Sequence, residues 1–324
     1  LTGGLHVTDA TNASRTALMD IATGCWDAAL LDLWRVPLKA LPRIVDCAGE
    51  LGHTLAEHVG APIPITGLAG DQQAASIGQA CLRPGDTKAT YGTGAFILTN
   101  TGQHQPASRH RLLGTVAWQL SGIRSYALEG SVFVAGSLIR WLRDELRLIA
   151  SAEETEALAR SVTGSGGAYV VPALAGLGAP HWEPSARGSI SGLSFATGRA
   201  HIVRAAMEAM AYQTHDLMTA FASDGAAWGL LKIDGGMAVN DWLGQDLADI
   251  TNLDVERPRF VETTALGAAM LAGLGCGIFS SLEEAVTMRG PVSRFVPNLP
   301  EQERNHRLAG WRQAVASVLA TTRS

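Results

Sequence analysis

The spacing of hydrophobic residues along the first part of the chain is helical. Apolar side chains recur every three to four residues between positions 12 and 60, for example at Trp26 and Leu30, so we expect helix there. Pro62–Gly67 is a short extended run that ends on a glycine. The segment Leu68–Leu82 that follows is expected to form a helix.

Strand and helix patterns alternate after a turn signal at Arg83–Asp86, which is also a candidate domain boundary. Two short runs, Lys88–Tyr91 and Phe96–Asn100, are expected to be strands joined by the turn Gly92–Gly94. The later expected elements are a helix marked by Val132, Ala135, Ile139, Leu142 and Leu146, a strand at Ala168–Leu174, a helix over Val203–Phe221, a strand at Leu230–Ile233 and a helix from about Asn240. This alternation indicates an α/β or mixed α+β fold.

The composition is that of a folded protein. The 324 residues are 47% hydrophobic and 17% charged, which allows sizeable cores, and the length suggests two domains. The net charge is -5 and the 25 Lys and Arg residues are dispersed, which argues against a nucleic-acid partner and a polybasic membrane surface. The longest uncharged stretch, Thr263–Leu282, would just reach across a bilayer, but its Gly and Ala content favours a buried helix.

The cysteine pattern favours a reducing compartment. The four cysteines, at positions 25, 47, 81 and 276, form no CxxC pair and no other short spacing, so neither a disulfide framework nor a zinc site is expected. The cytoplasm is therefore the expected location. The sequence leaves the oligomeric state open, and a homo-oligomer is compatible with it.

Three glycine-rich turns are candidates for binding phosphate groups. They are Tyr91–Gly94 (YGTG), Gly176–Pro180 (GLGAP) and Asp234–Asn240 (DGGMAVN), and each follows or joins expected strands. Glycines let backbone N–H groups approach phosphate oxygens, and a helix start after the third turn favours an anion. One such turn is usually only a tight turn, whereas three together favour nucleotide binding. The sequence lacks a P-loop and a glycine-rich dinucleotide motif after a strand.

Two single residues have more than one interpretation. Asp71 stands at the start of an expected helix, where it is an N-cap, a base that accepts a proton from a substrate hydroxyl in phosphoryl transfer, or both. Gly136 falls inside an expected helix, where glycine costs about 1 kcal/mol relative to alanine. It either permits close helix packing or leaves room for a ligand such as adenine.

These motifs, in this order, resemble the FGGY family of sugar kinases in the actin-like superfamily. The segment Gly188–Glu208 is similar to a long signature of that family, and four other stretches resemble its glycerol-phosphorylating branch in particular: His6–Thr16, Gly67–Ala75, Ala89–Gly102 and Glu129–Leu146. The resemblance implies an actin-like, ribonuclease H-like kinase fold with two domains around a cleft. Residues 1–82 would be the C-terminal part of the first, substrate-side domain, and residues 83–324 the second, nucleotide-side domain.

The resemblance also implies a role for each candidate site residue. Asp71 would be the catalytic base and lie near the Mg²⁺ of MgATP, Gln72 would bind a hydroxyl of glycerol, and Phe96 would contact its carbon chain. The expected contacts to ATP or ADP come from Thr93, Gly136, Arg140, Gly236 and Asn240. The implied reaction is phosphorylation of glycerol to sn-glycerol 3-phosphate. Another polyol or sugar as substrate, and an inactive nucleotide-binding fragment, are the alternatives.

The sequence departs from the family pattern in three places. Arg140 stands where the family usually has a glutamine near the nucleotide. The segment Ala56–Gly67 lacks the basic, glycine-rich loop of members that a sugar bisphosphate regulates, so such regulation is not expected. The family's opening phosphate turn, its Arg–Glu pair and the aromatic residues of its substrate pocket do not occur. The chain is therefore expected to be the C-terminal part of a longer enzyme, with an incomplete first domain.

Overall fold

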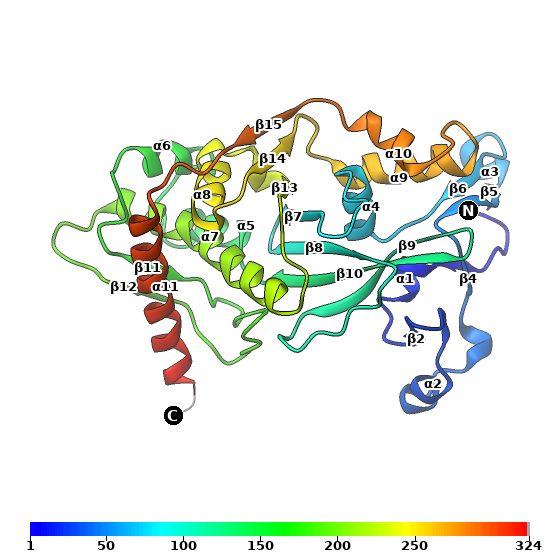
Figure 1. Cartoon of the computed structure of the whole chain (residues 1–324), viewed down its shortest axis with the longest axis horizontal. Coiled ribbons are helices and arrows are strands. Elements are labelled where there is room, and N and C mark those ends of the chain that lie inside the picture. Colours follow the sequence, from blue (N-terminus) through cyan, green and yellow to red (C-terminus); the bar gives the residue numbers. More distant parts are fainter. Residues whose placement is uncertain (323–324) are drawn as a thin grey trace.

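A seven-stranded mixed sheet forms the centre of the computed structural model, which describes residues 1–322 (Figure 1). The strand order is β15-β14-β13-β7-β8-β10-β9. β13 runs parallel to β7 and β14, and the other neighbours are antiparallel. The strands are β7 (Thr87–Tyr91), β8 (Ala95–Gly102), β9 (Leu113–Leu120), β10 (Ile123–Val132), β13 (Leu231–Asp234), β14 (Val255–Pro258) and β15 (Val292–Phe295). The expected mixed α/β class is confirmed.

Helices cover both faces of this sheet because successive side chains of a strand point to opposite faces. On β8, Ile97 packs into the main core with α7, α8 and α11, whereas its neighbour Leu98 packs into a second core with α4, α9 and α10. Figure 1 shows α4 beside α9, and α11 next to the C-terminus. These helices are α4 (Asp71–Gly78), α5 (Gly136–Asp144), α6 (Glu154–Arg160), α7 (Arg199–Ser223), α8 (Asp241–Thr251), α9 (Thr263–Gly275), α10 (Leu282–Ala285) and α11 (Glu301–Thr321).

The N-terminal segment is not the helical region that its apolar spacing predicts. It contains three two-stranded sheets and only short helices, because glycine and proline interrupt it; Gly24 has a φ of +74° and Pro37 has no N–H to donate. Trp26 and Ile44 pack around a small core that includes Val116 and Tyr126 of the central sheet. The elements are β1 (Val7–Asp9), α1 (Ala10–Ala13), β2 (Met19–Asp20), β3 (Cys25–Trp26), α2 (Ala28–Trp34), β4 (Arg43–Val45), β5 (Ala48–His53), α3 (Ala56–Val59) and β6 (Pro64–Gly67).

Three of the later expected elements have different bounds in the structure. Val132 is the last residue of β10, and α5 begins only at Gly136, so Gly136 is not inside a helix and the interior glycine cost does not apply. The strand expected at Ala168–Leu174 is confined to β11 (Tyr169–Val171), which pairs with β12 (Ser189–Ser191). The uncharged stretch from Thr263 forms α9 and ends as a helix at Gly275.

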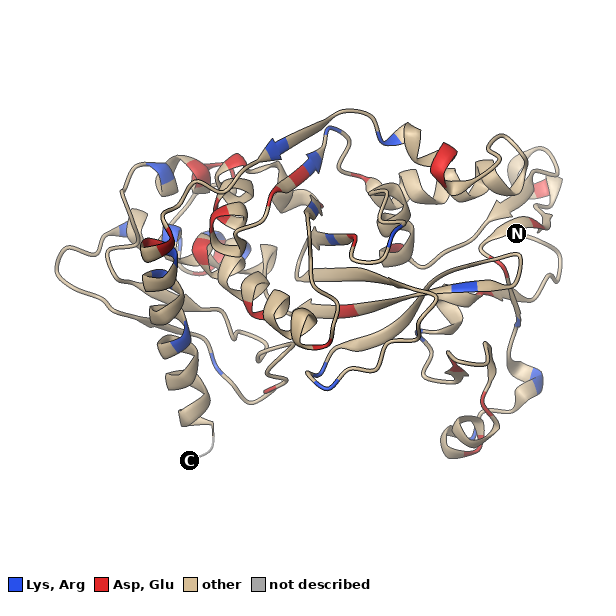
Figure 2. Cartoon of the chain, viewed as in Figure 1, with Lys and Arg blue, Asp and Glu red and all other residues tan. Residues whose placement is uncertain are grey.

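The charged residues are dispersed along the folded chain, as the sequence predicts. Figure 2 shows segments of Lys and Arg interspersed with segments of Asp and Glu along the ribbon. One side of α9 is buried, with Met270 and Leu271 in the second core, whereas Ala268 on the other side is exposed. Across residues 1–322, no helix combines the length and the apolar character needed to cross a membrane.

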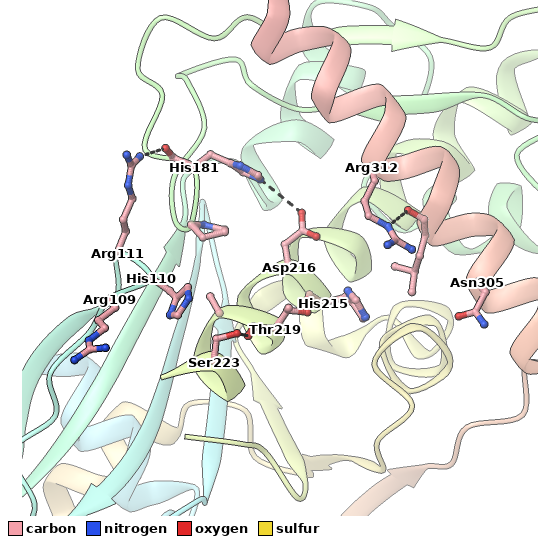
Figure 3. A pocket seen from close by; sticks show the side chains of 13 residues that line it. Arg109, His110, Arg111, His181, His215, Asp216, Thr219, Ser223, Asn305 and Arg312 are labelled. Carbon is pink, nitrogen blue, oxygen red and sulfur yellow. Dashed lines mark hydrogen bonds and ion pairs between the residues drawn. The ribbon is translucent and has the colours of Figure 1, made fainter. Parts of the chain in front are cut away.

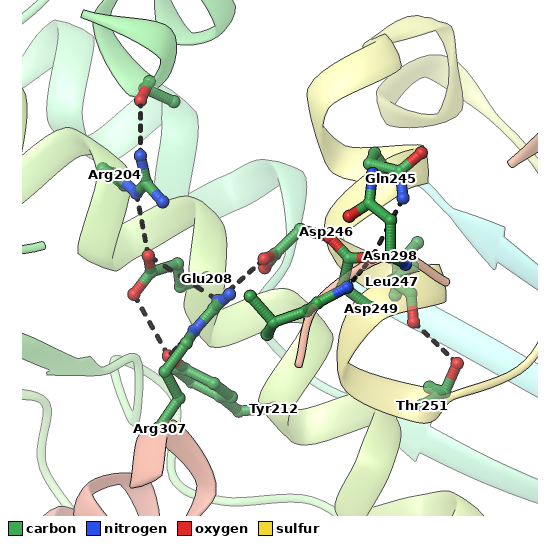
Figure 4. Close-up of polar contacts among 12 residues, drawn as sticks. Arg204, Glu208, Tyr212, Gln245, Asp246, Leu247, Asp249, Thr251, Asn298 and Arg307 are labelled. Atoms are coloured by element: carbon green, nitrogen blue, oxygen red, sulfur yellow. Dashed lines mark hydrogen bonds and ion pairs between the residues drawn. The ribbon is translucent and has the colours of Figure 1, made fainter. Parts of the chain in front are cut away.

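A buried ion-pair network joins α7, α8 and α11 (Figure 4). Glu208 accepts hydrogen bonds from Arg204 Nε (2.9 Å) and Tyr212 Oη (3.1 Å). Arg307 of α11 donates from Nε to Tyr212 Oη (2.9 Å), and its Nη2 lies 2.7 Å from Asp246 Oδ1 of α8. All five residues are mostly buried, and Arg307 is their link to α11.

Candidate active site

The hairpin between β7 and β8 forms the centre of the candidate site. Tyr91 and Ala95 close the antiparallel ladder, and the Gly92 N–H donates to the Gly94 carbonyl (2.9 Å). A Cβ atom on Gly94 would lie 2.5 Å from the Val132 carbonyl oxygen at the end of β10. Only glycine fits this close approach, so the YGTG sequence holds the hairpin tip against β10.

The start of α5 is bonded directly to this hairpin tip. The Gly136 N–H donates to the Gly92 carbonyl (2.9 Å), and the Ser137 N–H and hydroxyl both donate to the Thr93 carbonyl (3.1 and 2.9 Å). A Cβ atom on Gly136 would lie 2.5 Å from the Gly92 oxygen, so backbone packing requires this glycine. One turn later, Arg140 Nη2 donates to Thr93 Oγ1 (3.2 Å). Three of the predicted nucleotide contacts thus adjoin one another.

The DGG turn brings the remaining predicted nucleotide residues to the same hairpin. β13 runs beside β7 with Asp234 opposite Thr90, and Gly235 follows with a φ of +86°. A Cβ on Gly235 would lie 2.6 Å from the Tyr91 carbonyl oxygen. The next residue, Gly236, is exposed and begins a 3-10 helix over Gly236–Val239. This helix is adjacent to α5, because the Met237 side chain lies 3.4 Å from the position of a Gly136 Cβ.

Asn240 ends this 3-10 helix and caps the next one. Its Oδ1 accepts from the Leu243 N–H (3.0 Å), so Asn240 is the N-cap of α8, and its Nδ2 donates to Thr155 Oγ1 of α6 (3.2 Å). The helix predicted from about Asn240 is confirmed. The Asn240 side chain thereby joins the start of α8 to α6.

Asp71 is the first residue of α4, and the N-cap interpretation is wrong because Gly70 occupies that position. Asp71 Oδ1 accepts only from the adjacent Gln72 N–H (2.7 Å), and within residues 1–322 its Oδ2 has no hydrogen-bond partner. The helix start is held in place because the Gly70 N–H donates to Thr11 Oγ1 (2.7 Å). An exposed carboxylate at a helix N-terminus is stabilised by the helix dipole and stays available to a ligand.

A buried lysine, which no motif in the sequence indicates, bonds both to Gln72 and to the strand residue opposite Phe96. Lys88 of β7 is fully buried, and its Nζ donates to Gln72 Oε1 and to Thr90 Oγ1 (2.9 Å). Phe96 lies directly opposite Thr90 on β8, and 39% of its surface is exposed. Burial lowers the pKa of Lys88, and the nearby carboxylates, among them Asp71, partly offset that effect. A single charged residue in an otherwise uncharged strand was the available sequence signal.

The third glycine-rich turn, GLGAP, packs on the end of β10. The Ala179 N–H donates to the Ser131 carbonyl (3.1 Å), and a Cβ on Gly178 would lie 2.4 Å from that oxygen. Leu177 also forms a short bridge with Glu183. These contacts make the turn a support for β10, and they bond it to none of the predicted site residues.

The 610 Å³ cavity drawn in Figure 3 lies elsewhere, between α7, α11 and the segment Arg109–Arg111. Its Asp216 accepts from Trp311 Nε1 (2.8 Å) and lies 3.8 Å from His181 Nε2. The eight predicted site residues lie outside the lining of this cavity. The predicted site residues therefore lie on and next to α4, the β7–β8 hairpin and the DGG turn, and not in this cavity.

Comparison with known proteins identifies the family of this chain. A model of the C-terminal domain of the FGGY family of carbohydrate kinases matches residues 87–276, and a model of its N-terminal domain matches residues 1–78. The chain belongs to this family. The expected FGGY resemblance is thus confirmed over most of the sequence.

The curated relatives of this FGGY chain include glycerol kinases of several bacteria. One from Rhodospirillum rubrum is 54% identical over 325 residues, which cover 100% of this chain and 66% of the relative. Another, from Alcanivorax borkumensis, is 53% identical over 322 residues, which cover 99% of this chain and 65% of the relative. The chain spans slightly less than two thirds of the length of these relatives.

Solved structures confirm the actin-like kinase fold of the chain. The crystal structure of Plasmodium falciparum glycerol kinase with ADP has a TM-score of 0.92 and 38% identity, and the match covers 98% of this chain and 64% of the other. A xylulose kinase from Rhodospirillum rubrum matches with a TM-score of 0.85 at 24% identity, over 100% of this chain and 66% of the other. The second likeness concerns the fold alone.

Proposed function

We propose that this chain carries the catalytic base and the nucleotide side of a glycerol kinase, which transfers the γ-phosphoryl group of ATP to glycerol. The observation that carries this proposal is the position of Asp71, with a free carboxylate oxygen, on the same surface as Gln72 and Phe96. This surface continues along β7 to the glycine turns. The identity of 54% with a glycerol kinase supports the choice of glycerol.

In the proposed mechanism, Asp71 acts as general base on a terminal hydroxyl of glycerol. The hydroxyl oxygen attacks the γ-phosphorus in line, the bond from this phosphorus to the bridging oxygen breaks, and ADP leaves. The hydroxyl proton moves to the free oxygen of Asp71. The products are sn-glycerol 3-phosphate and ADP, and the exposed face of Phe96 would contact the carbon chain of glycerol.

We propose that Thr93, Gly136, Arg140, Gly236 and Asn240 surround the nucleotide. The first four adjoin one another around the hairpin tip, and Asn240 ends the 3-10 helix that begins at Gly236. Gly236 is exposed and has no side chain, so its backbone N–H can approach phosphate oxygens closely. The Plasmodium falciparum relative was crystallised with ADP, which supports this class of ligand.

The residues around Asp71 fit Mg²⁺ only as a nucleotide-bound ion. No group of three or more His, Cys, Asp or Glu residues that could hold a metal occurs in the described part of the chain. Mg²⁺ is commonly held by one or two carboxylates together with phosphate oxygens and water, and the Asp71 carboxylate would provide one such ligand through Oδ1, so that Oδ2 stays free for the hydroxyl proton. The ion would neutralise charge on the phosphates.

The proposed domain organisation separates a substrate side from a nucleotide side. We assign residues 1–82 to the first, substrate-side domain and residues 83–324 to the second, nucleotide-side domain. The long strands β9 and β10 pack against the first segment, where Arg15 Nη2 donates to buried Glu129 Oε1 (2.8 Å). We also propose the cytoplasm as the location, which fits the four free cysteines.

The decisive experiment measures glycerol-dependent ADP formation by the purified 324-residue chain with MgATP, together with ADP binding by calorimetry. Asp71→Asn is expected to lower turnover about 10²–10⁴-fold because the base is lost, and to leave the affinity for ADP without Mg²⁺ within twofold because Asp71 is not among the proposed nucleotide contacts. Asp32→Asn, at an exposed position of α2, is the matched control. Turnover that survives Asp71→Asn would refute the base assignment. Absence of glycerol-dependent turnover in the unmodified chain would refute activity of these residues alone.

A further inference from the structure

The buried side chain of Lys88 determines which atoms of Gln72 face outward. A lysine ammonium has three donors and no acceptor, so its partner on Gln72 must be the carbonyl oxygen. The contact from Lys88 Nζ to Gln72 Oε1 is consistent with this assignment. The two N–H groups of Gln72 Nε2 are therefore directed away from Lys88 and remain donors for another group.

We infer that Lys88 is a positioning residue, which orients the Gln72 amide so that its N–H groups face the substrate. This inference rests on the proposed function. Asp71 supplies an acceptor and the adjacent Gln72 supplies a donor, so together they suit a hydroxyl group that donates to Asp71 and accepts from Gln72. A substrate group with only donors or only acceptors would satisfy one of the two side chains and leave the other unpaired.

The neighbouring lysine shows that burial alone does not produce this contact. Lys232 of β13 pairs directly with Lys88 in the sheet, and both side chains are buried. The Lys232 ammonium donates to the Ala80 carbonyl (2.8 Å) and lies 3.9 Å from Asp86, so it binds the segment that follows α4. Lys88 differs from Lys232 because its bond goes to a predicted substrate residue.

The charges around Lys88 account for a buried ammonium at this position. Asp71, Asp234 and Glu129 all attract its charge. Glu129 is 2% exposed, and its Oε2 has no hydrogen-bond partner among residues 1–322, although Oε1 pairs with Arg15. Removal of the Lys88 charge would therefore take away one of the cations that attract these carboxylates, so the tests below include a variant, Gln72→Glu, that keeps this charge.

The first test compares Lys88→Met with Lys232→Met in the 324-residue chain. Loss of the hydrogen bond that orients Gln72 is expected to raise the KM for glycerol about tenfold and to change the KM for ATP less than twofold. Lys232→Met removes the same charge from the neighbouring strand and is expected to leave both KM values within twofold. An unchanged glycerol KM in Lys88→Met, or an equal rise in both variants, would overturn the inference.

Gln72→Glu tests the same inference with Lys88 intact. The carboxylate keeps an acceptor for the Lys88 ammonium but has no N–H donor, so the melting temperature is expected to stay equal or rise while the glycerol KM rises about tenfold. If Lys88→Met does not fold, this variant still tests whether Gln72 presents an N–H donor to glycerol. A glycerol KM that is the same for Gln72→Glu and the unmodified chain would contradict an outward-facing donor.

Side-chain amide NMR separates this inference from the proposed function. If the unmodified chain shows no glycerol-dependent turnover, the proposed activity of these residues fails. The environment of the Gln72 amide can still be compared between variants by NMR, because this measurement needs no turnover. The Gln72 side-chain N–H signals, identified by their loss in Gln72→Glu, are expected to shift in Lys88→Met and to stay in place in Lys232→Met. Unchanged signals in Lys88→Met would overturn the positioning role.

Discussion

Replacement of Arg307 by Met should destabilise the protein because it leaves a buried carboxylate without its cation. Arg307 links α11 to Asp246 of α8 and to Tyr212 of α7 (Figure 4). Glu208 keeps its hydrogen bond from Arg204 in the variant, so Asp246 carries most of the loss. Breaking a buried ion pair from one side costs about 3–5 kcal/mol. Because Glu208 stays paired, we expect a value near the lower end, about 3 kcal/mol.

The loss of stability in Arg307→Met should depend on pH. Burial raises the pKa of Asp246 from 3.8 to about 6 even with Arg307 nearby. A carboxyl group with a raised pKa binds more protons in the folded state than in the unfolded state, so its contribution to stability falls as pH rises from about 4 to about 6. Without Arg307 the pKa rises further and this window extends to higher pH. The destabilisation should therefore be larger at pH 8 than at pH 5.

Thermal unfolding followed by circular dichroism at pH 5 and pH 8 measures this effect. For a chain of 324 residues the conversion is about 1.5 °C per kcal/mol, so the expected fall in Tm at pH 8 is about 4–5 °C. Arg143→Met is the matched control, since Arg143 pairs with Asp144 on the exposed side of α5, and its Tm should not change measurably. An Arg307→Met variant with the Tm of the control, or with equal losses at both pH values, would refute the reasoning.

Two further predictions concern the hairpin tip and the cysteines. Gly136→Ala should weaken ADP binding at least tenfold in calorimetry, because the new Cβ would lie 2.5 Å from the Gly92 oxygen and displace α5 from the hairpin. The control is Gly229→Ala, where a Cβ meets no atom within 4 Å, and this variant should bind ADP normally. Equal ADP affinities of the two variants would contradict the packing role of Gly136. Thiol labelling of the native chain should modify two cysteines quickly and two only after unfolding, because burial raises the pKa of the inner pair; four fast thiols would contradict this. The fast pair is Cys25 and Cys276, and the slow pair is Cys47 and Cys81.

The sequence predicted long elements with a clear hydrophobic period better than short elements. The helix expected over Val203–Phe221 lies within α7, and the strands expected at Lys88–Tyr91 and Phe96–Asn100 lie within β7 and β8. The helix prediction for residues 12–60 failed because each element there is only two to seven residues long. Such elements are too short for a hydrophobic period to be distinguished from chance. The prediction of a helix from Val132 failed for a related reason. The apolar residues at the end of β10 continue the hydrophobic spacing of α5, so the sequence does not show where the strand ends.

The sequence by itself determined the family and which residues are candidates for the site, since both depend on motifs that are contiguous in the chain. Only the tertiary structure decided how these motifs meet. Asp71 proved to be the first helical residue with a free oxygen, Gly136 proved to be a packing requirement of the hairpin, and Lys88 proved to hold Gln72. Each of these facts depends on the register of strands and on contacts between segments far apart in the chain. The period of a sequence reports which face of its own element a residue occupies, and it carries no information about the partner on that face.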